Sequence, residues 1–152
     1  MIKLVRVDHR LIHGQVALSW TNSIGADCIL VADDGVIEDP LQKATLKMAA
    51  PHNIKAVIKS VDDSIEAINN GKTENYKLFI VVGSVDSAYR LISGISGVER
   101  LNLGGTKVRE GTHKISKAIN LTADEEAQLR LLKDAGVKIE IQQVPTDAVS
   151  EF

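Results

Sequence analysis

The stretch VRVDHRLIHGQVALSW, from Val5 to Trp20, joins an apolar run to a new periodic segment. Within eight positions it carries five side chains that can hold a charge: Arg6, Asp8, His9, Arg10 and His13. A connection that only had to turn would use Gly, Asn, Asp or Pro. We therefore expect this loop to carry chemistry, and to lie between a strand and a helix.

Outward from this loop, short apolar runs alternate with longer amphipathic segments. The runs expected as strands are Ile2–Val7, Cys28–Ala32, Ile54–Ser60, Tyr76–Gly83, Val98–Gly105 and Val137–Val144, with His113–Leu121 as a half-exposed strand. The segments expected as helices are residues 15–24, 40–50, 61–71, 86–93 and 122–136. This alternation predicts an α/β fold, a three-layer, doubly wound and mostly parallel sheet, in one domain over residues 1–152.

Two of these helices have clear start signals. Asp39 fits a helix cap followed by Pro40 as the first helical residue. Thr122 with Glu125 three residues later predicts a capping box. The residues expected to face inward from the first of these helices are Leu41, Ala44, Thr45, Met48 and Ala49. The tail after Pro145 is expected to be loop.

Composition narrows the function. The chain has a formal charge of −2 and a pI of about 6.1, which argues against a general affinity for nucleic acid or anionic lipid. A single cysteine, Cys28, favours a reducing compartment. No signal peptide is expected, and no apolar run approaches the ~18 to 20 residues of a membrane span. We expect a cytoplasmic protein that meets a membrane only through a partner.

Ligands of open α/β sheets sit at the carboxyl ends of the strands, near a change in strand order. That rule directs attention to the loops that follow four of the predicted strands. They are Asp8–Gly14, Asp33–Glu38, Gly83–Asp86 and Gly104–Thr112.

The first loop suits a dianion. It precedes a helix whose free N–H groups, at Gly14 and after, point toward the loop, and Arg6 and Arg10 add positive charge. The imidazole of His13 stands at the mouth of this site and is a nucleophile when neutral. Asp8 is placed to accept the second imidazole proton and so fix the tautomer. These residues together could accept and release a phosphoryl group.

A second candidate lies in NLGGTKVREGTHK, Asn102 to Lys114. Glycines at the end of a strand permit close approach of the backbone to a ligand, so Gly105 is expected to bind phosphate. Thr106, Lys107 and Arg109 add side-chain donors. The stretch lacks the Walker A spacing, and no G-x-G-x-x-G follows the first strand. A nucleotide cofactor is therefore not expected.

Less specific interpretations remain open for the same residues. His13 could be a structural or solvent-facing histidine, and the charged cluster could be a solvated ion-pair network. His9 and His13 have the i, i+4 spacing of a metal pair on a helix, but no nearby carboxylate or cysteine completes the set. Asp33 and Asp34 lie where Mg²⁺ binds in some α/β proteins, although shaping the loop is the simpler role. No metal is expected.

Three stretches together resemble the enzyme IIB subunits of the mannose/fructose/sorbose family of the bacterial phosphoenolpyruvate-dependent sugar phosphotransferase system. They are RVDHRLIHGQVALSW, ILVADDGVIEDPLQKATLKMAAP and LNLGGTK. The resemblance extends over nearly the whole chain in one register. The resemblance implies that His13 is the phosphorylated residue and that Arg10 is its phosphate partner. It also implies a doubly wound α/β domain and a phosphohistidine–sugar phosphotransferase.

The mechanism implied by this resemblance is a relay. A IIA phosphohistidine would donate its phosphoryl group to His13, which would pass it to a sugar held by the membrane subunits IIC and IID. Arg6, Arg10 and the amides of Gly14 and Gln15 would hold the phosphoryl oxygens. No cofactor is required, because a phosphohistidine is already an energetic donor. The protein would then lie at the inner face of the membrane through IIC and IID.

Two other functions stay open. The domain could be a stand-alone phosphoacceptor that signals to a transcription regulator, with identical loop chemistry. A general α/β enzyme using a metal or nucleotide is the third option. The sugar, the homo-oligomeric state and the phosphorylated nitrogen of His13 are left undecided by the sequence.

Overall fold

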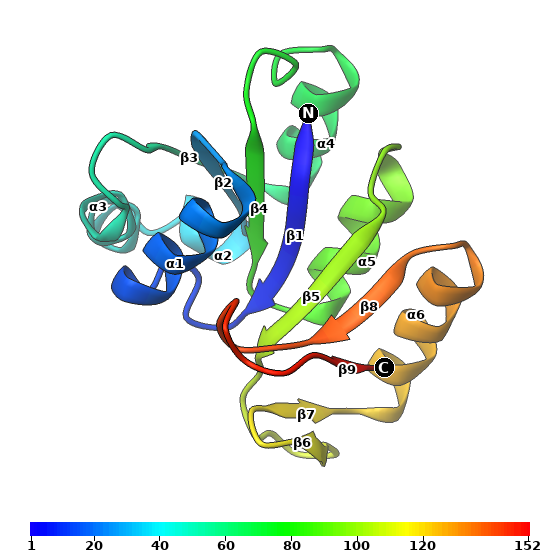
Figure 1. The fold of residues 1–152 in the computed structure, drawn as a ribbon. Helices are drawn as coiled ribbons and strands as arrows, with labels where there is room; N and C mark the ends of the chain where they lie inside the picture. The colour runs from blue at the N-terminus through cyan, green and yellow to red at the C-terminus, as the bar shows by residue number, and fades with distance from the viewer.

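The computed structural model describes all 152 residues. The strands of the sheet and of a separate hairpin are β1 (Ile2–Asp8), β2 (Cys28–Ala32), β3 (Lys55–Lys59), β4 (Leu78–Val82), β5 (Arg100–Gly105), β6 (His113–Ser116), β7 (Ile119–Leu121), β8 (Lys138–Ile141) and β9 (Ser150–Glu151). The helices are α1 (Gly14–Ile24), α2 (Asp34–Ile37), α3 (Pro40–Ala49), α4 (Val61–Asn69), α5 (Val85–Gly94) and α6 (Ala123–Asp134). Figure 1 shows the sheet between its helices.

The central sheet has seven strands in the order β3-β2-β4-β1-β5-β8-β9. All neighbouring pairs are parallel except β8 and β9. The chain runs outward from β1 through β2 to the edge strand β3, and then returns so that β4 lies between β2 and β1. The order of the strands therefore changes direction beside β1, and the loops after β1, β2, β4 and β5 meet at one edge of the sheet.

Two apolar layers cover the sheet, because side chains alternate along each strand. In β4, Leu78 and Ile80 face the layer under α4, α5 and α6, whereas Phe79 and Val81 face the layer under α1 and α3. The first layer contains 21 buried residues and the second 13, so both faces of the sheet are covered. This confirms the predicted three-layer, doubly wound α/β fold.

The predicted elements are present with three differences. The segment expected as one strand from His113 to Leu121 is the antiparallel hairpin of β6 and β7. The tail expected as loop ends in β9, which pairs antiparallel with β8. The loop expected after β2 holds the short helix α2, capped by Asp33. The predicted cap at Asp39 and the capping box between Thr122 and Glu125 are confirmed.

The predicted inward stripe of α3 is wrong at Leu41, Ala44, Thr45 and Met48, whereas Ala49 is partly buried against the core as predicted. Leu41 is 78% exposed and Met48 is 86% exposed, and Leu46 is the only fully buried residue of the helix. The physical reason is position: α3 lies beside α2 and the edge strand β3, so only a narrow line of the helix meets the core. Ala44 and Thr45 face solvent with Leu41.

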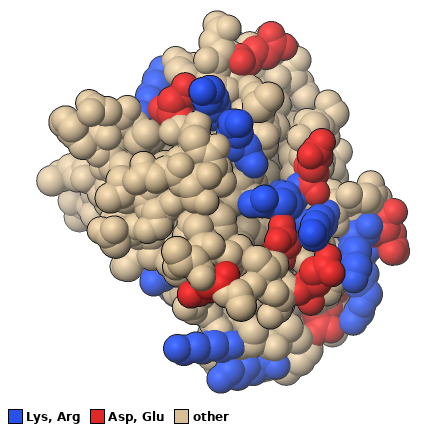
Figure 2. Space-filling view, in the orientation of Figure 1, with Lys and Arg blue, Asp and Glu red and all other residues tan.

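On the face drawn in Figure 2, the charged side chains do not form one basic surface. Figure 2 shows lysines and arginines interspersed with aspartates and glutamates on the visible face. None of the helices is long and apolar enough to cross a bilayer.

Candidate functional site

The loop between β1 and α1 is fixed by two buried side chains. Leu11 and Ile12 pack into the apolar layer below α1, and the Leu11 amide donates to the carbonyl of Asp8 at 2.9 Å. Leu11 has a φ of +61°, a left-handed conformation that is costly for a residue with a side chain. The surrounding contacts therefore force the loop into one path, with Arg10 and His13 directed to the exposed side.

His13 stands at the amino end of α1. It is exposed, its backbone is extended, and its side chain makes no capping hydrogen bond. Gly14 and Gln15 are also exposed, and no side chain accepts from their amides. The imidazole thus lies beside uncapped N–H groups and the positive end of the helix dipole, which favours an anion at this place.

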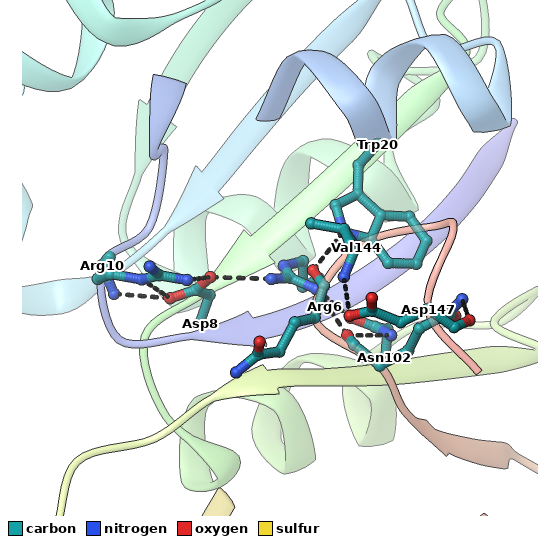
Figure 3. Close-up of polar contacts among 9 residues, drawn as sticks. Arg6, Asp8, Arg10, Trp20, Asn102, Val144 and Asp147 are labelled. Atoms are coloured by element: carbon teal, nitrogen blue, oxygen red, sulfur yellow. Dashed lines mark hydrogen bonds and ion pairs between the residues drawn. The ribbon is translucent and has the colours of Figure 1, made fainter. Parts of the chain in front are cut away.

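Asp8 is the centre of a buried charge network (Figure 3). Its Oδ2 accepts from Arg6 Nη2 at 3.0 Å and from Arg10 Nη2 at 3.2 Å. Its Oδ1 accepts from the backbone amide of Arg10 at 3.0 Å and from Arg10 Nε at 3.2 Å. Burial raises the pKa of Asp8, but hydrogen bonds from Arg10 and the charges of both arginines outweigh burial and hold the pKa below its usual value.

This network corrects the predicted role of Asp8. Both carboxylate oxygens are occupied by arginine donors, and none of its hydrogen bonds joins it to His13. Asp8 therefore does not fix the imidazole tautomer in this structure. What it fixes is Arg10, whose side chain is 39% exposed and whose Nη1 makes no hydrogen bond.

Arg6 lies inside the protein and not at the mouth of the loop. It is 2% exposed, and its Nη1 donates to the side chain of Asn102 and to the carbonyl of Gln142 at 3.1 Å. Its guanidinium carbon lies 5.3 Å from the centre of the Trp20 ring. Burial lowers the pKa of Arg6, and the neighbouring Asp8 opposes that change. This surrounding does not support the expectation that Arg6 contacts phosphate.

The glycine loop after β5 also differs from expectation. Gly104 makes room for Arg6, because a Cβ at that position would stand 2.1 Å from the guanidinium carbon. Thr106 is buried, and its hydroxyl donates to the carbonyl of Asn120 and accepts from the Asn120 amide. Gly105 lies beside Asp8. Of the three predicted donors in this loop, only Lys107 is exposed without a salt bridge or a side-chain hydrogen bond.

The four loops at this edge of the sheet do meet around one cavity of about 360 Å³. His9, Asp33, Ser84 and Lys107 line it, together with Thr106, whereas His13 and Arg10 do not. A larger cavity of about 650 Å³ opens at the opposite edge of the sheet, between Met1 and Arg100. We place the site at the loop of His13, because the charged network and the uncapped helix end are there and not at either cavity.

No group of three or more histidine, cysteine or acidic side chains is arranged to hold a metal ion. Asp33 caps α2 by accepting from the amide of Val36 at 2.8 Å. Asp34 accepts from the amide of Val61 at 2.9 Å and from Arg90 at 2.8 Å. These two aspartates therefore shape the second loop and tie it to α4 and α5.

Sequence reasoning missed the supports of the charge network. Asn102 was passed over, although a polar residue in the middle of the apolar run LNL is a usable signal. Trp20 is buried on α1, where packing is the expected role, and its Nε1 also donates to the carbonyl of Gln143 at 3.0 Å. Gln142 gave no signal, because it acts through its backbone carbonyl.

The comparisons with known proteins assign the chain to a family. A model of the family described as PTS system sorbose subfamily IIB component matches residues 2–152. The chain belongs to this family. The predicted resemblance to IIB subunits of the mannose, fructose and sorbose type is confirmed.

Two curated relatives and one solved structure also place this chain among IIB components. This IIB chain is 39% identical over 152 residues to the PTS system sorbose-specific EIIB component of Lacticaseibacillus casei, covering all of this chain and 93% of that protein. It is 30% identical over 147 residues to the mannose-specific EIIAB component of Escherichia coli (strain K12), covering 97% of this chain and 46% of that protein. The IIB domain of the sorbose permease from Klebsiella pneumoniae superposes with a TM-score of 0.94 at 27% identity, covering 99% of this chain and 93% of that one.

The IIB family sets the general function. IIB components are phosphotransferases of the sugar phosphotransferase system, where they work with IIA and with the membrane components IIC and IID. The protein is a sugar-specific IIB component of this system.

Proposed function

We propose that this IIB component carries a phosphoryl group on His13, taken from a IIA phosphohistidine and delivered to a sugar held by IIC and IID. The observation that carries this proposal is the placement of one exposed imidazole at an uncapped helix end, on the same loop as a guanidinium fixed by a buried carboxylate. Family membership supports the reaction class.

The first transfer is a displacement at phosphorus. A neutral nitrogen of His13 forms a bond to phosphorus while the P–N bond of the donor histidine breaks, and the donor imidazole keeps the bonding electron pair and is protonated. In the second transfer a sugar hydroxyl forms the new O–P bond. The P–N bond at His13 then breaks, and the hydroxyl proton is taken up as the imidazole leaves.

The protein supplies position and charge in both steps. The amides of Gly14 and Gln15 and the free side of the Arg10 guanidinium are the groups proposed to hold the phosphoryl oxygens. Arginine suits this role because its planar fork matches several oxygens at once. The proposal leaves Thr106 and Gly105 out of direct contact, and assigns Lys107 to the rim, where it would attract an anionic partner.

The test is phosphoryl uptake. The purified chain, incubated with a phosphorylated IIA domain of a mannose-type system, is expected to gain one acid-labile phosphate, and His13→Ala is expected to gain none. His9→Ala and His113→Ala are matched controls that should label as the wild type does. Label on the His13→Ala variant would overturn the assignment.

A second measurement addresses Arg10 and the sugar step. Arg10→Ala is expected to slow uptake by about 10²- to 10³-fold, the usual cost of removing one donor to a developing anion. Membranes that carry IIC and IID should phosphorylate sugar only when the phosphorylated chain is added. A chain that labels normally but supports no sugar phosphorylation would favour the regulatory alternative.

A further inference from the structure

Arg6 is enclosed by protein groups. Its guanidinium donates to Asp8 on one side and to Asn102 and the Gln142 carbonyl on the other, while the ring of Trp20 lies against it. The side chain is buried, so a phosphoryl group arriving at the exposed loop cannot displace these partners without opening the core. A buried arginine whose two terminal nitrogens both donate to protein groups is a structural support and not a ligand-binding group.

The carboxylate of Asp8 links the buried Arg6 to the partly exposed Arg10. Arg6 and Arg10 donate to the same oxygen of Asp8, Oδ2, from opposite sides (Figure 3). The other oxygen accepts from the Arg10 backbone and from Arg10 Nε. The orientation of Arg10 thus depends on Asp8, and Asp8 is held from within by Arg6.

We propose that Arg6 is a positioning residue of the phosphotransfer site, which fixes Asp8 from inside the protein so that Asp8 presents Arg10 at the loop of His13. The proposal rests on the function given above and changes the role of Arg6 from phosphate contact to support. Arg10 remains the residue that would contact the phosphoryl group.

The physical need for Arg6 follows from the exposure of Arg10. Arg10 is partly exposed and has a long side chain, so holding it in one rotamer is costly in entropy. Two charged partners on Asp8 keep the carboxylate ionised and prevent its rotation, which makes it a rigid acceptor. With Arg6 removed, Asp8 would be a buried carboxylate with a single, mobile partner. His9 is a further titratable group on this side, since a Cβ built on Gly105 would lie 3.5 Å from both Asp8 Oδ1 and His9 Nδ1.

The same network joins the site to a distant part of the chain. The segment after β8 supplies the Gln142 carbonyl to Arg6 and Asn102, and the Gln143 carbonyl to Trp20. The side chain of Gln142 then holds the turn that follows, through the carbonyls of Pro145 and Asp147. The partners of Arg6 on this side therefore come from β5 and from the segment after β8, 96 and 136 residues further along the chain than Arg6.

The test compares Arg6→Met and Arg6→Lys with Arg90→Met, a control that removes an arginine paired with aspartates at the surface. The ¹⁵N NMR signal of Arg10 Nε–H reports its bond to Asp8, and the carboxyl ¹³C signal of Asp8 reports its titration. In Arg6→Met the Arg10 Nε–H signal should move to the position of a free arginine. The pH midpoint of the Asp8 carboxyl titration should rise. Uptake from phosphoramidate, a small donor that needs no partner protein, should fall by on the order of tenfold to a hundredfold per folded molecule.

The conservative variant separates positioning from simple stability. Arg6→Lys keeps the charge without the fork, so it should restore the midpoint of Asp8 but only part of the rate. If Arg6→Met does not fold, Asn102→Ala removes one partner of Arg6 and should shift the Arg10 signal in the same direction. An unchanged Arg10 signal, or a rate loss that only follows the unfolded fraction, would overturn the proposal. The NMR readouts need no phosphoryl transfer, so they stand even if His13 is not the acceptor.

Discussion

The backbone of Gly104 lies directly against the guanidinium of Arg6, so that a Cβ at position 104 would stand 2.1 Å from Cζ of Arg6. The glycine next to it is different, since a Cβ at Gly105 would meet Asp8 and His9 at an ordinary 3.5 Å. One of the two glycines is therefore required by the buried charge network, and the other is not. The pair offers a matched test of how tightly that network is packed.

Gly104→Ala is expected to destabilise the protein by about 3 kcal/mol, because the methyl group displaces a buried, paired arginine. Gly105→Ala should cost less than about 1 kcal/mol. Urea unfolding followed by the fluorescence of Trp20, the one tryptophan of the chain, gives both values. If Gly104→Ala and Gly105→Ala lower the free energy of unfolding equally, Arg6 moves aside without an energetic cost.

A second prediction concerns pH and Asp8. Its pKa is lower in the folded protein than in an unfolded chain, where it is about 3.9. The ionised carboxylate therefore stabilises the fold fully above about pH 4, and this stabilisation is lost as the pH falls from there through the folded pKa. Asp8→Asn should cost about 3 to 5 kcal/mol at pH 7, because it leaves Arg6 without its counter-charge.

The measurement for Asp8 is the free energy of unfolding of the wild type and Asp8→Asn from pH 7 down to pH 3. The difference in the free energy of unfolding between the wild type and Asp8→Asn should be constant above about pH 5, and it should narrow below about pH 4. A difference that stays constant down to pH 3 would mean that the Asp8 carboxylate is not preferentially ionised in the folded state.

The sequence was most informative where one rule dominated. The apolar runs of β2 and β4 are buried on both faces, and such continuous apolar runs are typical of strands in a parallel sheet, as predicted. The unusual charge density around Asp8 and His13 marks the loop that we propose to carry the function, since no turn requires those residues. The sequence predicts a feature well when residues close to it along the chain are its physical cause.

Predictions failed where the cause was a neighbour distant in the sequence. Arg6 is predicted to hold phosphate because it adds positive charge to the loop, but it pairs in register with Asn102 across the sheet and is buried. Gly104 was attributed to a ligand, although Arg6 explains it. Arg6, Asn102 and Gly104 come together only because β1 and β5 are neighbours in the sheet. Patterns of residues along the chain do not predict that strand order.

The outward stripe of α3 gives a third prediction. Leu41→Ser and Met48→Ser should change the free energy of unfolding by less than about 0.5 kcal/mol, since both side chains are exposed. Leu46→Ala, on the buried line of the same helix, should cost about 2 to 4 kcal/mol. Chemical unfolding of the three variants is the measurement. A loss above about 1 kcal/mol in either serine variant would favour the inward stripe expected from the sequence.

A fourth prediction separates stability from function at Gly14. No heavy atom lies within 4 Å of the place where its Cβ would stand, and its φ is not positive, so neither packing nor backbone strain requires a glycine there. Gly14→Ala should therefore stabilise α1 by about 0.5 to 1 kcal/mol, because alanine has the higher helix propensity and a less flexible unfolded chain.

The same methyl group should harm the reaction. It would stand beside the amide that we propose to hold a phosphoryl oxygen next to His13, and would restrict the approach of the partner protein. Gly14→Ala is expected to raise the midpoint of thermal unfolding and to slow phosphoryl uptake from the IIA domain by on the order of tenfold. A variant that is more stable and transfers at the wild-type rate would remove the Gly14 amide from the site.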